Sequence, residues 1–118
     1  MNAIFTRRSI RKFTDEPVTD QELEQLLRAG MAAACAKNSQ NRFFFVERGT
    51  GSLPGLIQVH PNAFALKTAQ AAIVVAADRK KGAALDPLDD WWGQDCSPPI
   101  QNILVEAADL GLGTLCNR

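Results

Sequence analysis

Four cations and one hydroxyl stand close together near the start of this chain, in the segment RRSIRKF at residues 7–13. Guanidinium groups bind phosphate oxygens in pairs, and the hydroxyl of Ser9 would add a further donor. The segment therefore predicts a site for a terminal phosphate monoester, with Ile10 and Phe13 anchoring it to the core. The alternative is a solvated basic stretch that binds no ligand.

A second polar cluster, Asn38-Ser39-Gln40, lies between a predicted helix and a predicted strand. Amide groups in a short loop of this kind could read the carbonyl and ring-nitrogen edge of a planar heterocycle. The alternative is a loop whose Asn and Ser serve only its turn geometry.

The charge of the whole chain favours neither nucleic acid nor a membrane surface as partner, because 13 Lys and Arg balance 13 Asp and Glu. No apolar run approaches the roughly 18 residues that cross a bilayer. The N-terminus also lacks the pattern of a signal peptide. We therefore expect a cytoplasmic protein with one domain over residues 1–118.

Cys35, Cys96 and Cys116 are odd in number, widely separated and without a C-x-x-C pair. This spacing argues against a disulfide framework and against a structural zinc site. Free thiols in a reducing cytoplasm are expected, and no metal site is predicted.

The elements that must position these residues begin with a short helix over residues 2–6, whose Ile4 and Phe5 are expected to turn inward. A capping box formed by Thr19 and Glu22 predicts the start of a longer helix over residues 20–33. The apolar stripe of this helix recurs at helical spacing. It consists of Leu23, Leu26, Leu27 and Met31.

The remaining elements alternate between strands and helices. FFFV at residues 43–46 predicts a buried strand, and AAIVVAA at residues 71–77 predicts a central strand covered on both faces. Pro61 could open a helix that reaches Thr68, and Ser97 followed by Pro98 predicts the start of a deeply buried helix to Leu110. The Gly-Leu-Gly run after that helix predicts its stop. A further strand would begin at residues 114–116.

These pieces together resemble the nitroreductase family over nearly the whole chain. The resemblance rests on RRSIRKF, on DEPV at 15–18, on GMAA at 30–33 with the N-S-Q loop after it, and on AIVV at 72–75. It continues through W-x-Q-D-C-S at 92–97, QNIL at 101–104 and LGLG at 110–113. It implies an α+β fold with a mainly antiparallel central sheet and helices on both faces, working as a homodimer.

The resemblance also implies a function. Members of the family bind FMN and pass hydride equivalents from NAD(P)H to a nitroaromatic, quinone or similar acceptor by a ping-pong mechanism. The flavin carries the chemistry, so the chain is expected to supply no catalytic acid, base or nucleophile. The implied cofactor residues are Arg7, Arg8, Ser9 and Arg11 for the phosphate and nearby flavin edge, Asn38, Ser39 and Gln40 from the partner subunit, and Gln94 near the pyrimidine edge of the ring.

Some positions depart from the family pattern. Where the family usually reads Pro-Ser-x-Gly-Asn-x-Gln-Pro-Trp, this chain keeps the Asn and Gln but has Lys37 for the Gly and Arg42 for the large apolar residue. The family's C-terminal portion, with a further strand and a tail around the partner, is expected to be missing. These departures support a rival hypothesis, in which the chain is a truncated, non-catalytic remnant that folds only as an assembly and binds no flavin productively.

Overall fold

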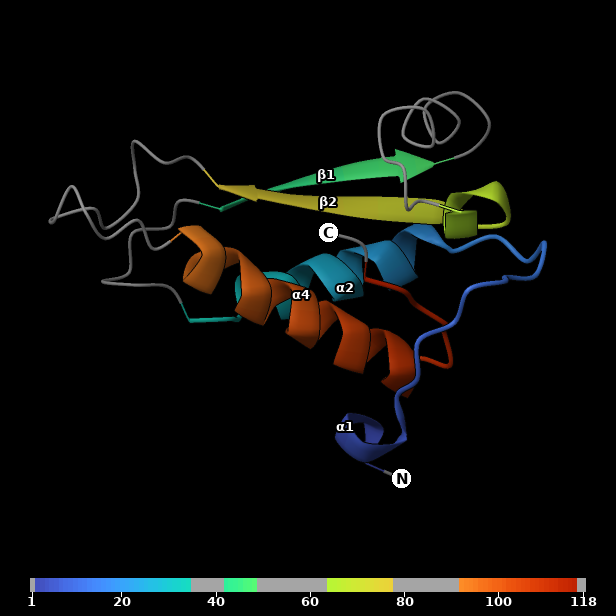
Figure 1. Ribbon diagram of the computed structural model, residues 1–118, viewed down its shortest axis with the longest axis horizontal. Coiled ribbons are helices and arrows are strands. Elements are labelled where there is room, and N and C mark those ends of the chain that lie inside the picture. The colour runs from blue at the N-terminus through green and yellow to red at the C-terminus, as the bar shows by residue number, and fades with distance from the viewer. Residues whose placement is uncertain (1, 35–41, 49–63, 78–91, 117–118) are drawn as a thin grey trace, which may run out of the picture.

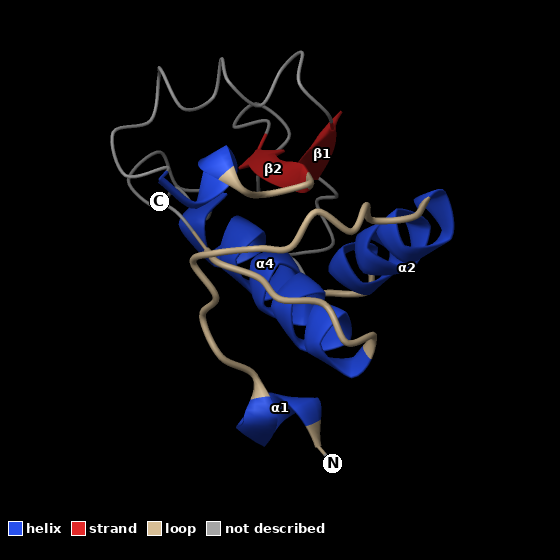
Figure 2. Cartoon of the chain, turned by 90° about the vertical axis from the view of Figure 1, so that its right-hand side faces the viewer, coloured by secondary structure: helices blue, strands red, loops and turns tan. Residues whose placement is uncertain are grey.

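The computed structural model of the protein describes residues 2–34, 42–48, 64–77 and 92–116. Two helices, α2 (Asp20–Met31) and α4 (Trp92–Asp109), lie side by side beneath a sheet of two strands, β1 (Arg42–Arg48) and β2 (Ala71–Ala77) (Figures 1 and 2). A one-turn helix, α1 (Ala3–Thr6), packs against α4, and the 3-10 helix η2 (Phe64–Lys67) precedes β2.

The two strands are antiparallel, and their register decides which side chains face the helices. Phe44 pairs with Val75 and both pack against the buried core of Leu26, Ile103 and Ala107. The neighbouring pair, Phe45 and Val74, faces away from this core because successive side chains of a strand point to opposite faces.

The prediction that the first strand is buried is wrong on its outer face, since Phe43 and Phe45 are 43% and 54% exposed. The second strand likewise was expected to be covered on both faces, but Val74 is 38% exposed. In the described part of the chain, helices cover only one face of the sheet, so the outward side chains have no layer above them (Figure 1).

The capping box is confirmed: the Glu22 amide donates to Thr19 Oγ1 at 3.1 Å, and the Thr19 amide donates to Glu22 Oε1 at 2.9 Å. Leu23 and Leu26 are buried as predicted. Met31 is 63% exposed, so its assignment to the buried stripe is wrong. Met31 is the last residue of α2, and the position buried on its last turn is Gly30.

The short N-terminal helix is present, but its predicted orientation is wrong. Ile4 and Phe5 are 60% and 78% exposed, whereas Ala3 is buried. A helix of four residues turns one narrow side toward its neighbour. Here that side carries the small side chain of Ala3.

The predicted start of the last helix is also wrong, because α4 begins at Trp92 and carries Pro98 and Pro99 inside it. Pro is favoured in the first turn, where its missing N–H costs little, and this preference led to the later start. Ser97 is therefore not the N-cap. Pro99 is fully buried.

The predicted stop of α4 is confirmed. Gly111 has φ of 80°, and the amides of Gly111 and Leu112 donate to the carbonyls of Ala108 at 3.1 Å and Ala107 at 2.8 Å. These two bonds form a Schellman motif, which requires a residue in the left-handed region. The predicted helix before Thr68 is the 3-10 helix Phe64–Lys67; residues 61–63 are outside the described part.

Candidate functional site

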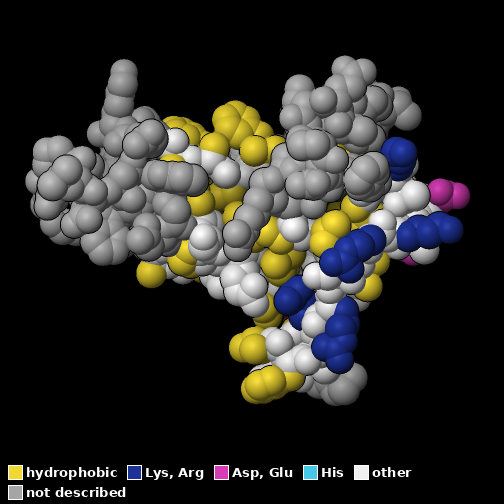
Figure 3. All heavy atoms as spheres, in the orientation of Figure 1, with side chains coloured by type: hydrophobic (Ala, Val, Ile, Leu, Met, Phe, Trp, Pro, Cys, Tyr) yellow, Lys and Arg dark blue, Asp and Glu magenta, His cyan; other side chains and the backbone are white. Residues whose placement is uncertain are grey.

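The basic segment, residues 7–12, leaves α1 as extended chain and runs along one side of the molecule. Arg7 is half-buried, while Arg8, Ser9 and Arg11 are exposed. Lys and Arg side chains gather on this side, as the dark blue atoms of Figure 3 show. Among the described residues, Arg7, Arg11 and Lys12 form no ion pair with a carboxylate. The cluster thus carries positive charge that is free to meet an anion.

The backbone of the basic segment is fixed near both of its ends. The amide of Arg7 donates to the carbonyl of Ala3 at 3.0 Å, which ties the segment to α1. The amide of Ile10 donates to the carbonyl of Thr114 at 2.9 Å, within a parallel bridge between Ser9 and Thr114. Residues 114–116, predicted as the start of a strand, thus make a single bridge in the described chain.

Beyond the basic segment the chain is held by side chains from the turn between η2 and β2. Thr68 Oγ1 accepts a hydrogen bond from the Phe13 amide at 3.1 Å. Gln70 Nε2 donates to the carbonyl of Thr14 at 3.2 Å. The predicted anchoring role of Phe13 is thus carried in part by its backbone, and Ile10 is 37% exposed rather than buried.

A cavity of about 790 Å³ adjoins the basic segment, and its wall includes Ile10 and Lys12 but none of Arg7, Arg8, Ser9 and Arg11. Most of the wall is apolar and comes from both layers, with contributions from α2, α4, β2 and residues 110–116. Cavities that hold small molecules usually measure roughly 300–1,000 Å³ and carry a few polar groups on apolar walls. Its volume and lining are therefore suited to a small-molecule ligand beside a cationic strip.

The second predicted cluster, Asn38-Ser39-Gln40, lies outside the described residues. The two ends of that loop are described, and Arg42 joins them. Its Nη2 donates to the carbonyl of Ala33 at 2.7 Å, and its Nη1 donates to the carbonyl of Ala34 at 3.3 Å. An Arg at the place of a large apolar residue thus binds carbonyls just beyond the end of α2.

This role of Arg42 was missed in the sequence. A cation near the C-terminus of a helix can bind the last carbonyls and complement the helix dipole, and that pattern was the available signal. This pattern is a weak indication for Arg42, because the polar loop separates it in sequence from the end of α2.

Gln94 lies in the first turn of α4, where the structure describes the backbone alone. Its predicted contact with a flavin ring stays a prediction. The first turn of α4 and the basic segment lie toward opposite ends of the molecule in Figure 1. Arg7, Arg8, Ser9 and Arg11 thus follow one another along one extended segment, and the first turn of α4, which carries Gln94, lies away from it.

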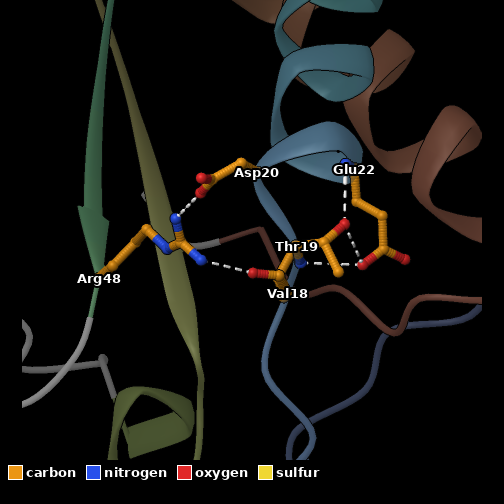
Figure 4. A network of polar contacts seen from close by, with 5 residues as sticks. All are labelled: Val18, Thr19, Asp20, Glu22 and Arg48. Carbon is orange, nitrogen blue, oxygen red and sulfur yellow. Dashed lines mark hydrogen bonds and ion pairs between the residues drawn. The ribbon is translucent and has the colours of Figure 1, made fainter.

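Arg48 at the end of β1 is a second residue that sequence reasoning missed. It forms an ion pair with Asp20, and its Nη2 donates to the carbonyl of Val18 at 2.6 Å (Figure 4). These contacts join the strand to the N-terminus of α2, next to the capping box. They fix the far end of the connection that leads from the basic segment to α2.

Within the described ranges, no three or more His, Cys, Asp or Glu side chains form a group that could hold a metal ion. Cys96 is buried and Cys116 is exposed, and neither forms a disulfide bond. The described helices include none that is long and apolar enough to span a membrane.

Comparison with known proteins finds similarity to one family. The model of the nitroreductase family matches residues 4–54. Two archaeal relatives, both provisionally named NADH dehydrogenase/NAD(P)H nitroreductase, match 98% of this chain. The one from Methanothermobacter thermautotrophicus is 37% identical and the one from Archaeoglobus fulgidus is 39% identical.

Among solved structures, a protein from Desulfovibrio desulfuricans described as a nitroreductase in complex with FMN superposes with a TM-score of 0.83. It is 32% identical, and the match covers 94% of this chain and 63% of that one. The chain is thus similar in sequence and structure to proteins of the nitroreductase family, and the predicted α+β fold of nitroreductase type is confirmed. It spans 58% and 64% of the lengths of the two archaeal relatives.

Proposed function

We propose that this protein is an FMN-dependent oxidoreductase that passes hydride equivalents from NAD(P)H to a nitroaromatic, quinone or similar acceptor by a ping-pong mechanism. One observation carries the proposal. A cationic segment without carboxylate partners among the described residues is fixed by its backbone beside a cavity of about 790 Å³. Such a strip can bind an anion, and a phosphate at the end of a flavin side chain supplies one.

The residues present fit FMN in their donor chemistry. Arg7, Arg8 and Arg11 offer planar donor groups that match phosphate oxygens, and the exposed Ser9 hydroxyl adds a neutral donor. Three neighbouring guanidinium groups repel each other, so a bound dianion would lower the free energy of the cluster. The FMN complex of the relative from Desulfovibrio desulfuricans supports the same cofactor.

When bound, FMN would supply the hydride chemistry, and this chain would bind and orient it. In the proposal, Arg7, Arg8, Ser9 and Arg11 hold the phosphate and nearby flavin edge. Asn38, Ser39, Gln40 and Gln94 approach the ring, the loop residues from the partner subunit of a homodimer.

A visible absorption spectrum tests the cofactor directly. Purified protein should carry FMN or acquire flavin bands on incubation with FMN, and FAD should bind more weakly. The sequence has no Gly-rich pyrophosphate loop of the G-x-G-x-x-G type, which motivates this preference. Protein that stays colourless in excess FMN would contradict the proposal and favour the non-catalytic remnant.

A further inference from the structure

Arg11 and Lys12 lie between two backbone anchors that reach distant parts of the chain. On one side of them, the Ile10 amide donates to the Thr114 carbonyl at 2.9 Å. On the other side, the Phe13 amide donates to Thr68 Oγ1 at 3.1 Å. Two cations are thus held in a span whose ends are both fixed.

The second anchor differs from the first because its acceptor is a side chain. The Thr68 hydroxyl is partly buried and has a partner for each of its roles. It donates to the carbonyl of Ala65 at 3.4 Å while it accepts from Phe13. The Thr68 amide also donates to the Ala65 carbonyl, at 3.2 Å, so the residue is held by the last turn of η2.

Gln70 supports the same junction. Its Nε2 donates to the carbonyl of Thr14 at 3.2 Å and to the carbonyl of Thr68 at 3.4 Å. The turn between η2 and β2 therefore binds two consecutive residues of the chain that follows the cations. The polar side-chain groups of Thr68 and Gln70 named here thus bind backbone groups at this junction.

We propose that Thr68 is a positioning residue for the anion site, acting on Arg11 and Lys12 through the Phe13 amide. This inference rests on the proposed function. A long cationic side chain loses conformational freedom when it binds phosphate, and a mobile backbone beneath it would add to that loss. Because the Thr68 hydroxyl already fixes this backbone in the free protein, binding of phosphate costs less backbone freedom.

The test compares Thr68→Val, which keeps the shape and removes the hydroxyl, with Thr68→Ser, which keeps the hydroxyl. FMN and riboflavin affinities are measured for the wild type and both variants, and unfolding in urea is followed in parallel. Thr68→Val should bind FMN about three- to tenfold more weakly, as expected for one lost hydrogen bond, and riboflavin unchanged. Thr68→Ser should restore the FMN affinity.

A second measurement does not depend on flavin binding. Inorganic phosphate is titrated into the free protein while the amide resonances of Arg11 and Lys12 are followed by NMR, together with hydrogen exchange at Phe13. In Thr68→Val the Phe13 amide should exchange faster and phosphate should bind more weakly. If the wild type binds phosphate but no FMN, the proposed function fails while the positioning role is still tested.

Two results would overturn the inference. One is equal weakening of FMN and riboflavin in Thr68→Val, which would indicate a general loss of structure. The other is an unchanged phosphate affinity despite faster exchange at Phe13. Should Thr68→Val fail to fold, Gln70→Leu is the second variant, because it removes only the neighbouring hydrogen bonds. It should also weaken FMN binding without affecting riboflavin, by a smaller factor. Equal weakening of both flavins in Gln70→Leu would reject the proposal as well.

Discussion

Ile10 packs so closely on Gly113 that a Cβ atom at Gly113 would lie 3.1 Å from Ile10 Cγ1 and 3.2 Å from Ile10 Cβ. Both residues adjoin the parallel bridge between Ser9 and Thr114. The cationic segment and the residues after α4 therefore come together at a point where one of them lacks a side chain. This contact explains why a glycine is suited to position 113, outside the helix stop itself.

Gly113→Ala should push Ile10 away and weaken the hydrogen bond from the Ile10 amide to Thr114. The expected loss is about 0.5–1.5 kcal/mol of unfolding free energy, the usual net value of one such bond. The measurement is urea unfolding, with hydrogen exchange at the Ile10 amide. In the background of Ile10→Ala, where two of the three contacting carbons are gone, the same change should cost less. Equal costs in both backgrounds would show that Ile10 is not the obstacle.

Gly30→Ala tests the packing of α2 beneath β1. A Cβ atom there would lie 2.9 Å from Phe44 Cε1 and 3.0 Å from Ile103 Cδ1. Overpacking costs about 1–3 kcal/mol, and the gain of up to about 1 kcal/mol in helix propensity offsets part of it. We expect a net destabilisation of about 0.5–2 kcal/mol in urea unfolding.

Gly111→Ala is the matched control for that prediction. A Cβ atom at Gly111 would meet nothing within 4 Å, but φ there is 80°. Gly111→Ala should therefore lower the unfolding free energy by about 1–2 kcal/mol through its backbone conformation alone. Gly111→Asn should lower it less. The Gly30→Ala cost should instead fall when Phe44 is shortened to Leu. Both explanations would be contradicted if Phe44→Leu reduced the cost of Gly111→Ala and left that of Gly30→Ala unchanged.

Arg42→Met tests the contact across the polar loop. It removes the donors to the carbonyls of Ala33 and Ala34 and keeps an aliphatic stem. Hydrogen bonds from charged donors contribute about 1.5–3 kcal/mol when shielded, and partial exposure of this site lowers the expected loss to about 0.5–2 kcal/mol. The measurement is thermal and urea unfolding.

Arg28→Met is the control for Arg42. Arg28 pairs with Glu24 at 3.0 Å, but these side chains are 77% and 65% exposed. Exposed pairs of this spacing contribute about 0.3–0.5 kcal/mol, so the control should be nearly neutral. Losses of equal size in the two variants would mean that Arg42 acts only through its charge on the surface.

Much of the fold follows from local sequence patterns, and the incorrect predictions concern features that local patterns do not determine. The capping box at Thr19 and the helix stop at Gly111 depend on residues close in sequence, so they could be predicted. The orientations of Phe5 and Phe45 could not, because they depend on which layers cover α1 and the sheet. A local rule also placed the start of α4 at Ser97, whereas the helix begins at Trp92.

The sequence alone predicts candidate ligands for the site but not the residues that hold them in place. The arginines are adjacent in sequence, and their chemistry points to phosphate without any structure. Thr68 joins Phe13 across 55 positions, and Arg48 joins Asp20 across 28. Neither pair follows from spacing, because only the packing of β1, η2 and the N-terminal segment brings them together.

Arg11→Ala separates a phosphate ligand from a structural cation. If Arg11 binds the phosphate of FMN, its loss should weaken FMN binding by about 1.5–3 kcal/mol, roughly ten- to a hundredfold. Riboflavin lacks the phosphate and should bind the parent and the variant almost equally. Fluorescence quenching of each flavin gives both affinities. Equal losses for the two ligands would assign Arg11 to the fold instead.

The last prediction is that the chain associates with itself. Phe43 and Phe45 are 43% and 54% exposed on the outer face of the sheet, and Phe5 is 78% exposed on α1. Adjacent exposed aromatic side chains on a short sheet favour contact with a second surface.

Sedimentation velocity over a dilution series should therefore show a species larger than the monomer at micromolar concentration. Phe45→Thr keeps a good strand former while it removes the outward ring, so it should shift the distribution toward the monomer. Phe44→Leu is the inward control on the same strand and should lower stability without weakening association. A wild-type protein that stays a monodisperse monomer throughout the series, with a cooperative thermal transition, would refute self-association.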